Sequence, residues 1–441
     1  MTNSNQLETV YELITGAEQG HTCEGIPDEA CTEVPRNFFL NALNGTLTKL
    51  ADQLASPGLV LPWLLDALGA PATVIGFLTP VRRAGALLPQ LSIAGRIRQL
   101  EKRSLAWAFG AGMFGFWILM MVPAGIFLTG TLAGIMIVIL LAFASFGRAI
   151  SSVAFKDVLG KTIPKGSRGS LLAVRATLGG LLAVAAGVLM RLYVPQGSQI
   201  WPYLLLVGLG GGLWLISVLP IFLIQESPGV TEGARSGLKE AREGLILLRT
   251  VPGLRRFLYM RVAMISVELS LPFFTLYARR LTGAQASDLS VFVIAASLAQ
   301  VLSSPFWGRL ADRDSRIVLM ISATMAALAG GLALVTGLIA AAPINTYLLA
   351  GVILLQGFSL AGVRLGRNTY LVDGAPERER PLYVAVVNTL TGLLTLAGGL
   401  FGVIADIFGL PVLILLLSAM ALLGILASWS MPPVEQFSQT S

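Results

Sequence analysis

Two acidic residues stand inside otherwise apolar stretches of this chain, and their chemistry suits proton transfer. Asp52 and Glu268 are carboxylic acids in segments long enough to be helices. A carboxyl group whose hydration changes can take up and release a proton. Glu268 lies seven residues after Arg261, on the same helix face and about 10 Å away along the axis. That distance predicts separate partners, Lys49 or Arg82 for Glu268, so Glu268 is either a proton carrier or one member of a static salt bridge.

Basic residues in the same stretches outnumber these two acids. They are Lys49, Arg82, Arg83, Arg261, Arg364 and Arg367. Guanidinium groups bind carboxylate and phosphate groups through two parallel hydrogen bonds. The surplus therefore favours an anionic substrate. The alternative is that some of these arginines lie near helix ends and extend toward water, or bond to backbone carbonyls.

The first apolar stretch has one polar face when it is projected as a helix. The polar residues Asn41, Asn44, Thr48, Lys49, Asp52, Gln53 and Ser56 occupy about half of its circumference. Such a face predicts a helix that borders water or a polar interior. A simpler interpretation is that Lys49 and Asp52, three residues apart, neutralise each other.

Several kinds of chemistry are excluded by the residues that the chain lacks. Its one histidine, His21, lies in the amino-terminal tail, so neither a Ser-His-Asp triad nor a histidine-ligated metal site can form within the apolar segments. Glycine runs without a following Lys-Ser or Lys-Thr do not make a phosphate-binding loop. We therefore expect no enzyme activity, no cofactor and no metal. Cys23 and Cys31, with His21 in an acidic tail, match no zinc spacing, and a structural disulfide is not expected on the reducing side of a membrane.

The elements that hold these residues are membrane-spanning helices. The chain is 55% hydrophobic and 12% charged, with a mean hydropathy of +0.76, so its surface must face lipid. An all-α membrane protein with six spans in each half is predicted. The twelve segments are 37–64, 70–94, 104–129, 131–155, 169–193, 201–224, 256–278, 288–308, 316–340, 345–371, 381–404 and 409–430.

The remaining segments are expected to lie outside the bilayer. Residues 1–35 form an acidic tail with one short helix near 7–14, and they lack the features of a signal peptide. Residues 225–255 form a linker with an interfacial helix near 238–248, and 432–441 form a second tail. Nineteen basic residues fall in the loops on one side and three on the other, which predicts that both termini are cytoplasmic. The net charge of +7 is mainly this orientation signal and does not indicate a nucleic-acid partner.

Two short sequences recur at nearly the same offset. GRIRQLEKR at Gly95–Arg103 returns as GRLADRDSR at Gly308–Arg316, and 308 − 95 = 213. Arg148 and Asp157 recur as Arg364 and Asp373, and 364 − 148 = 216. The chain is therefore interpreted as a tandem duplication. Each Arg–Asp couple is expected to form a cytoplasmic latch.

Parallel repeats of six helices with this loop resemble the major facilitator superfamily. Gly308, Asp312 and Arg316 match the family's G-x-x-x-D-x-x-x-R loop, whereas in the first half Gly95 and Arg103 match and Gln99 replaces the acid. Glycine at this loop would let two helices approach closely, and the acid would pair across the cytoplasmic seam. The resemblance covers about residues 36–431.

The resemblance implies how the chain works. Bundles at 36–224 and 256–431 would rock around a cavity lined by the first, fourth, seventh and tenth helices. It implies a secondary transporter in a bacterial inner membrane, acting as a monomer on a small molecule, coupled to protons or another ion. The alternative is a transporter-like receptor or assembly partner that no longer transports.

Overall fold

Every regular element in the described part of the chain is a helix. The computed structural model describes residues 2–15, 26, 28–97, 99–194, 200–227, 248, 250–283, 285–311, 313–338, 342–376 and 380–437. The expected linker helix near 238–248 falls almost wholly outside these residues, as do His21, Cys23 and Asp312. The prediction of an all-α architecture is confirmed for the described residues.

The first half contains a short amino-terminal helix followed by the expected bundle. Its helices are α1 (Thr2–Thr15), η1 (Asp28–Glu33), α2 (Val34–Leu54), α3 (Val60–Ala67), α4 (Ala72–Gly76), α5 (Leu78–Leu87), α6 (Gln90–Ile97), α7 (Arg103–Leu119), α8 (Met121–Phe127), α9 (Gly130–Thr162), η2 (Lys165–Ser167), α10 (Arg168–Tyr193), α11 (Trp201–Ile216) and α12 (Val218–Leu223).

The second half repeats this arrangement. Its helices are α14 (Pro252–Leu269), α15 (Leu271–Thr282), α16 (Ala286–Ala311), α17 (Ser315–Thr336), α18 (Ala342–Gly374), α19 (Arg380–Ala397), η3 (Gly398–Leu400), α20 (Phe401–Phe408), α21 (Leu410–Trp429) and η4 (Val434–Gln436).

Ten of the described helical runs are long and apolar enough to cross a membrane. The two other expected spans correspond to α2 with α3 and to α4, α5 and α6. They pack alongside the ten, α2 against α10 and α5 against α9. Polar residues lower the hydropathy of α2, and the second expected span is divided into three short helices, with Pro89 between α5 and α6.

Prolines and glycines mark several other helix boundaries. Pro57 and Gly58 separate α2 from α3, and Pro272 lies in the first turn of α15, directly after the break at Ser270. Proline fits the first turn of a helix, whose N–H groups have no intrahelical partner. Gly283 ends α15 with a φ of +61°, a left-handed conformation that side chains disfavour.

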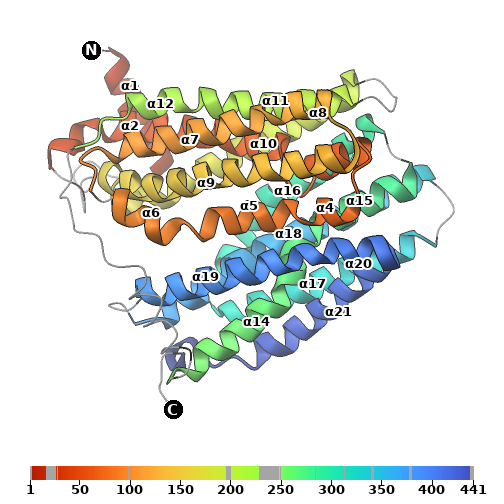
Figure 1. The fold of residues 1–441 in the computed structure, drawn as a ribbon. Coiled ribbons are helices and arrows are strands. Elements are labelled where there is room, and N and C mark those ends of the chain that lie inside the picture. Colours follow the sequence, from red (N-terminus) through yellow and green to blue (C-terminus); the bar gives the residue numbers. More distant parts are fainter. Residues whose placement is uncertain are drawn as a thin grey trace.

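The two halves meet along two helix pairs and at one end of the bundle. α10 contacts α16 and α5 contacts α19, while α3 packs on α15 and α4 on α20. We call the end that carries α3, α4, α15 and α20 the closed end, toward the right of Figure 1, and the end that carries α6 and the first turn of α14 the linker end. At the closed end a Cβ added to Gly76 would lie 2.8 Å from the Gly399 carbonyl oxygen. The backbones of the halves therefore touch directly there.

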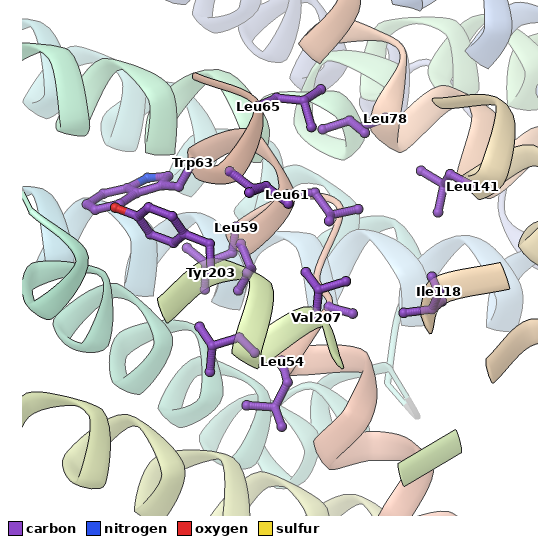
Figure 2. Packing of buried hydrophobic residues seen from close by; sticks show 14 of the residues in the cluster. Leu54, Leu59, Leu61, Trp63, Leu65, Leu78, Ile118, Leu141, Tyr203 and Val207 are labelled. Atoms are coloured by element: carbon purple, nitrogen blue, oxygen red, sulfur yellow. The ribbon is translucent and has the colours of Figure 1, made fainter. Parts of the chain in front are cut away.

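A buried apolar cluster fills the closed end. Trp63 of α3 packs on Phe292 and Tyr203, with ring centroids 5.5 and 6.4 Å apart. Figure 2 shows the Trp63 and Tyr203 rings side by side, with Leu61 and Leu65 of α3 next to them. Because Trp63 and Phe292 belong to different halves, burial of these rings stabilises the contact between halves.

The amino-terminal tail packs on the bundle more closely than its composition suggests. The hydroxyl of Tyr11 in α1 lies 2.7 Å from that of Ser167, and its ring packs edge-on against Phe38. Cys31 is disulfide-bonded, so the expectation of a reduced thiol is wrong for this residue. That expectation rested on the cellular compartment, which does not determine whether the chain brings two sulfur atoms together.

Candidate functional site

Asp52 is the centre of a group of cations from the first half. Arg148 of α9 donates to both of its carboxylate oxygens, at 2.8 and 3.4 Å. Arg82 of α5 lies 3.6 Å away, and the indole N–H of Trp214 donates at 3.3 Å. The Arg148 guanidinium also lies over the Trp214 ring. Helices α2, α5, α9 and α11 therefore converge on one carboxylate.

Glu268 holds a second group, which crosses between the halves. Its carboxylate accepts from Arg261 of the same helix at 2.9 Å and pairs with Arg367 of α18 at 3.0 Å. Arg83 of α5, from the first half, donates to its other oxygen. The Arg261 and Glu268 side chains are each only 2% exposed. A buried carboxylate with three guanidinium partners is well satisfied, and removing it would leave uncompensated positive charge.

The expected separation of Arg261 and Glu268 is wrong. They pair directly because both side chains are long enough to reach across the two helical turns between them. The proposed partners of Glu268 are also corrected. Arg82 pairs with Asp52, while its neighbour Arg83 reaches Glu268.

The polar face of α2 is mostly used to hold one arginine. Arg175 of α10 donates to the Asn41 side chain at 2.5 Å and to Asn44 at 3.3 Å. Asn44 donates in turn to the Ser217 carbonyl, and Thr48 donates to the Gly45 carbonyl of its own helix. Asn41, Asn44 and Thr48 are buried, so the polar face packs against protein rather than open water.

Gln53 extends this face across the boundary between halves. Its amide donates to the Gln300 side chain of α16 at 2.8 Å. The sequence interpretation gave Arg175 and Trp214 no part in the site. Arg175 could have been found as a charge in an apolar helix, whereas a tryptophan in such a helix carries no special signal.

Two interior cations make no ion pair or hydrogen bond with the described residues. They are Lys49 of α2 and Arg364 of α18. Arg364 is exposed, although it interacts electrostatically with Asp52 and Glu268 of opposite halves. It therefore faces water between the halves and not lipid. The expected neutralisation of Asp52 by Lys49 alone is also incomplete, because Arg148 and Arg82 bind that carboxylate.

These residues together form the central charge cluster. The name covers Lys49, Asp52, Arg82, Arg83, Arg148, Arg175, Arg261, Glu268, Arg364 and Arg367. They lie on α2, α5, α9, α10, α14 and α18. Of the candidate residues predicted from sequence, the structure brings both acids and all six of the listed basic residues into this cluster.

The predicted latch in the first half is corrected. Arg148 binds Asp52, whereas Asp157 pairs with Arg103 at 3.3 Å. Arg364 likewise makes no contact with Asp373. Both arginines lie nine residues from their expected partners, so the long helices place them in the interior while the acids lie nearer the linker end.

The loop before α7 is bound by the Glu226 carboxylate, which lies outside the repeated motif. The Glu226 carboxylate accepts from the backbone N–H groups of Arg103 and Ser104, at 3.1 and 2.7 Å. Lys161 of α9 donates to it at 2.8 Å. A carboxylate at this position satisfies the free N–H groups of a helix start and opposes the positive end of its dipole. Gly95 lies in α6, and Gln99 follows that helix.

The second copy of the loop is built differently from the expectation. Asp314 caps α17 by accepting from the Arg316 backbone at 2.8 Å, and the Arg316 guanidinium returns to Asp314 at 3.0 Å. Burial alone would raise the pKa of Asp314, but these hydrogen bonds hold it below its ordinary value. A Cβ added at Gly308 would meet no atom within 4 Å, so close helix approach does not explain this glycine. Asp312 lies outside the described residues.

Polar contacts between the halves gather at the closed end. Arg279 and Arg280 of α15 pair with Asp66, at 3.4 and 3.0 Å, and Trp63 donates to the Thr275 carbonyl. Asp406 of α20 accepts from the Ala72 and Thr73 backbone N–H groups at 2.9 and 2.7 Å, which caps α4. Access to the central charge cluster is therefore blocked at this end.

Comparison with known proteins agrees with this architecture. Residues 257–440 match the Major Facilitator Superfamily. An uncharacterized protein of Mycobacterium tuberculosis is 26% identical over 386 residues, which cover 84% of this chain and 72% of that protein. A multi-drug resistance efflux pump PmrA homolog of Lactococcus lactis is 31% identical over 166 residues, 36% of this chain and 39% of that protein.

Solved structures extend the fold assignment to nearly the whole chain. A mutant form of the nucleoside transporter NupG has a TM-score of 0.72 at 13% identity, covering 90% of this chain and 99% of that one. A D-xylose-proton symporter has a TM-score of 0.68 at 13% identity, covering 91% and 99%. The second half of the chain thus matches the Major Facilitator Superfamily in sequence, and about 90% of the chain shares its fold with solved membrane transporters.

Proposed function

We propose that this chain is a membrane transporter that moves a small organic anion by alternating access. The observation that carries the proposal is the charge balance of the central charge cluster. Among the described residues the cluster has eight basic side chains and two acidic ones, so its formal charge is 8 − 2 = +6. Each uncompensated charge at membrane depth costs about 2.5–3.5 kcal/mol on insertion scales. An anionic substrate would offset part of that cost.

Rocking of the halves about the cluster would expose it alternately to the two sides. The closed end is sealed by Trp63, Asp66 and Asp406 with their partners, and Arg364 of the cluster is exposed, so we infer that a substrate would enter this conformation from the linker end. From the distribution of basic residues, that end faces the cytoplasm of a bacterial inner membrane. One chain supplies both halves, which fits a monomeric transport unit. Reporter fusions after Ser441 and near Gly237 should both report cytoplasm, and a periplasmic signal at either site would contradict this orientation.

Proton coupling is the second part of the proposal. Asp52 and Glu268 are the acids of the cluster, and each binds arginines that an anion could also bind. Protonation of either acid would release arginine hydrogen bonds to the substrate. Glu268→Gln should then abolish proton-driven accumulation in membrane vesicles while anion exchange persists. Unchanged accumulation in both Glu268→Gln and Asp52→Asn would exclude these acids as proton carriers.

Transport by the full chain in proteoliposomes tests the anionic substrate directly. A panel of organic anions should include substrates whose uptake is saturable and is abolished when the protein is omitted. Neutral sugars and nucleosides serve as controls of similar size. Saturable uptake of a neutral or cationic solute, with every anion inactive, would reject the proposed substrate class.

A further inference from the structure

The two halves bind their central acids differently, although the residues occupy equivalent positions. Asp52 and Glu268 are separated by the same offset as Arg148 and Arg364, since 268 − 52 = 216 and 364 − 148 = 216. In the first half Arg148 binds Asp52 at 2.8 Å. By the repeat, Arg364 should bind Glu268.

Glu268 has other partners instead. Arg261, Arg367 and Arg83 surround its carboxylate, and Arg83 comes from the first half. Their guanidinium groups occupy the oxygens that Arg364 would use. Arg364 is therefore left without a counter-ion among the described residues, while its equivalent in the first half has one.

Lys49 is the matching unpaired cation on the first half. It lies on α2, one turn before Asp52, which attracts it without forming an ion pair, and it is repelled by Arg148, Arg364 and Arg175. The Asp52 oxygens are bound by Arg148 and approached by Arg82 and Trp214. Lys49 and Arg364 thus repel each other across the boundary between halves, and Arg364 is exposed to water there.

We propose that Lys49 and Arg364 anchor a dianionic group of the substrate, either a phosphate monoester or a pair of carboxylates. This rests on the proposed transport of an anion and specifies its charge and its anchor. A single negative charge would leave one of the two cations uncompensated, whereas a dianion matches both. Arg175 is hydrogen-bonded to the neutral Asn41 and Asn44 and adds to the positive potential.

The remaining arginines of the central charge cluster have a different role. Arg82, Arg83, Arg148, Arg261 and Arg367 already bind a carboxylate, so a substrate would have to displace Asp52 or Glu268 to reach them. While Asp52 and Glu268 are ionised, these arginines position the two acids and hold the helices together. They become available to a substrate only when the acid that they bind is protonated. Arg261, which the charge pattern alone would favour as a substrate ligand, belongs to this group.

Calorimetric titration of the full chain in lipid nanodiscs tests the anchor. Succinate and glucose 6-phosphate are the dianionic probes, and acetate and glucose are the monoanionic and neutral controls. At least one dianion should bind more tightly than both controls. Arg364→Gln and Lys49→Gln should each weaken its binding roughly ten- to a hundredfold, the usual range for losing one charge-assisted hydrogen bond. Which dianion responds distinguishes the phosphate from the dicarboxylate.

Matched variants separate loss of the anchor from loss of folding. Arg364→Lys keeps the charge and should bind more tightly than Arg364→Gln. Lys156→Gln removes an exposed cation from α9 and should leave binding unchanged. Size-exclusion profiles and melting temperatures of all variants should match the wild type.

Three outcomes would overturn the inference. One is dianion binding that is unaffected in well-folded Arg364→Gln and Lys49→Gln. Another is acetate binding as tight as that of either dianion, which would leave the proposed anion transport intact but reject the dianionic anchor. The third is a wild-type protein that binds none of the three anions, and transport of a neutral solute by that protein would reject the proposed function as well.

Discussion

Asp66 and Arg279 occupy equivalent positions in the two repeats and pair with each other at the closed end. Their offset, 279 − 66 = 213, equals that of the two repeated loops, and their charged groups lie 3.4 Å apart. Arg191 of α10 pairs with Asp288 of α16 at 3.0 Å. By the repeat these two residues correspond to Asp406 and Ala72, where Asp406 caps α4. The closed end is thus assembled from corresponding positions of both halves, one of which supplies an acid where the other supplies a base.

Removing Asp66 should loosen the closed end. Asp66→Ala eliminates ion pairs with Arg279 and Arg280, which are partly exposed and worth up to about 1 kcal/mol each. A cysteine at Phe273, now buried, should be labelled several-fold faster by a membrane-impermeant thiol reagent from that side. The experiment needs a background in which both native cysteines are replaced. Asp373→Ala, an exposed change near the linker end, is the control, and equal labelling in both variants would contradict the prediction.

Replacing Glu268 should destabilise the protein whether or not it carries a proton. Glu268→Gln leaves three guanidinium groups without their carboxylate, and breaking a buried pair in this way costs about 3–5 kcal/mol. The apparent melting temperature in detergent should fall by several degrees, whereas Glu435→Gln at an exposed site should not change it. An unchanged melting temperature would show that Glu268 is not held as the structure describes.

Glu226 should stabilise the start of α7. Its side chain is 1% exposed and accepts two backbone N–H groups and the Lys161 ammonium. Glu226→Ala would leave these donors unpaired, at about 1–3 kcal/mol for a buried group. Amide exchange at Arg103 and Ser104 should accelerate, with Glu101→Ala as an exposed control. When Gln99→Asp is added to Glu226→Ala, we expect the amides of Arg103 and Ser104 to stay unprotected. Full recovery of their protection would show that an acid at the motif position can replace Glu226.

The Asp314 cap should depend on pH in a defined direction. Its pKa lies below the ordinary value of 3.8, so the cap contributes stability above that value and loses it as the pH falls through the lowered pKa. Exchange at the Arg316 amide, corrected for intrinsic rates, should be constant at neutral pH and accelerate in acid below about pH 4. Asp314→Asn should remove this dependence while keeping part of the cap. A wild-type profile that is flat down to pH 2 would contradict the assignment.

The arrangement of helices could be predicted from sequence because a chain that spans lipid needs apolar helices of a minimum length. Apolar stretches of sufficient length, the repeat of Gly95–Arg103 at Gly308–Arg316 and the loop motif each indicate a two-part bundle. The same reasoning selected Asp52 and Glu268, because charges at membrane depth need a polar environment.

The partners of those charges could not be predicted. Spacing along one helix suggested that Arg261 and Glu268 have separate partners and that Arg148 belongs with Asp157, but both conclusions ignored the reach of an arginine side chain. Contacts between helices depend on how each helix is rotated about its axis. They also depend on which of several nearby cations lies close enough to the carboxylate to pair with it. Nothing in the sequence ranks Arg367 above Arg364 as a partner of Glu268, and Glu226 lies more than 120 residues from the N–H groups that it caps.

Arg82 and Arg83 are neighbours on α5, yet the first binds the acid of its own half and the second binds the acid of the other. Successive side chains on a helix point about 100° apart, so the assignment depends on the rotational phase of α5. Inserting or deleting one residue between Pro80 and Arg82 would turn the pair by that angle and misdirect both guanidinium groups. This short stretch should therefore vary in residue type among functional relatives but keep its length, a constraint on chain length that no single side chain reveals.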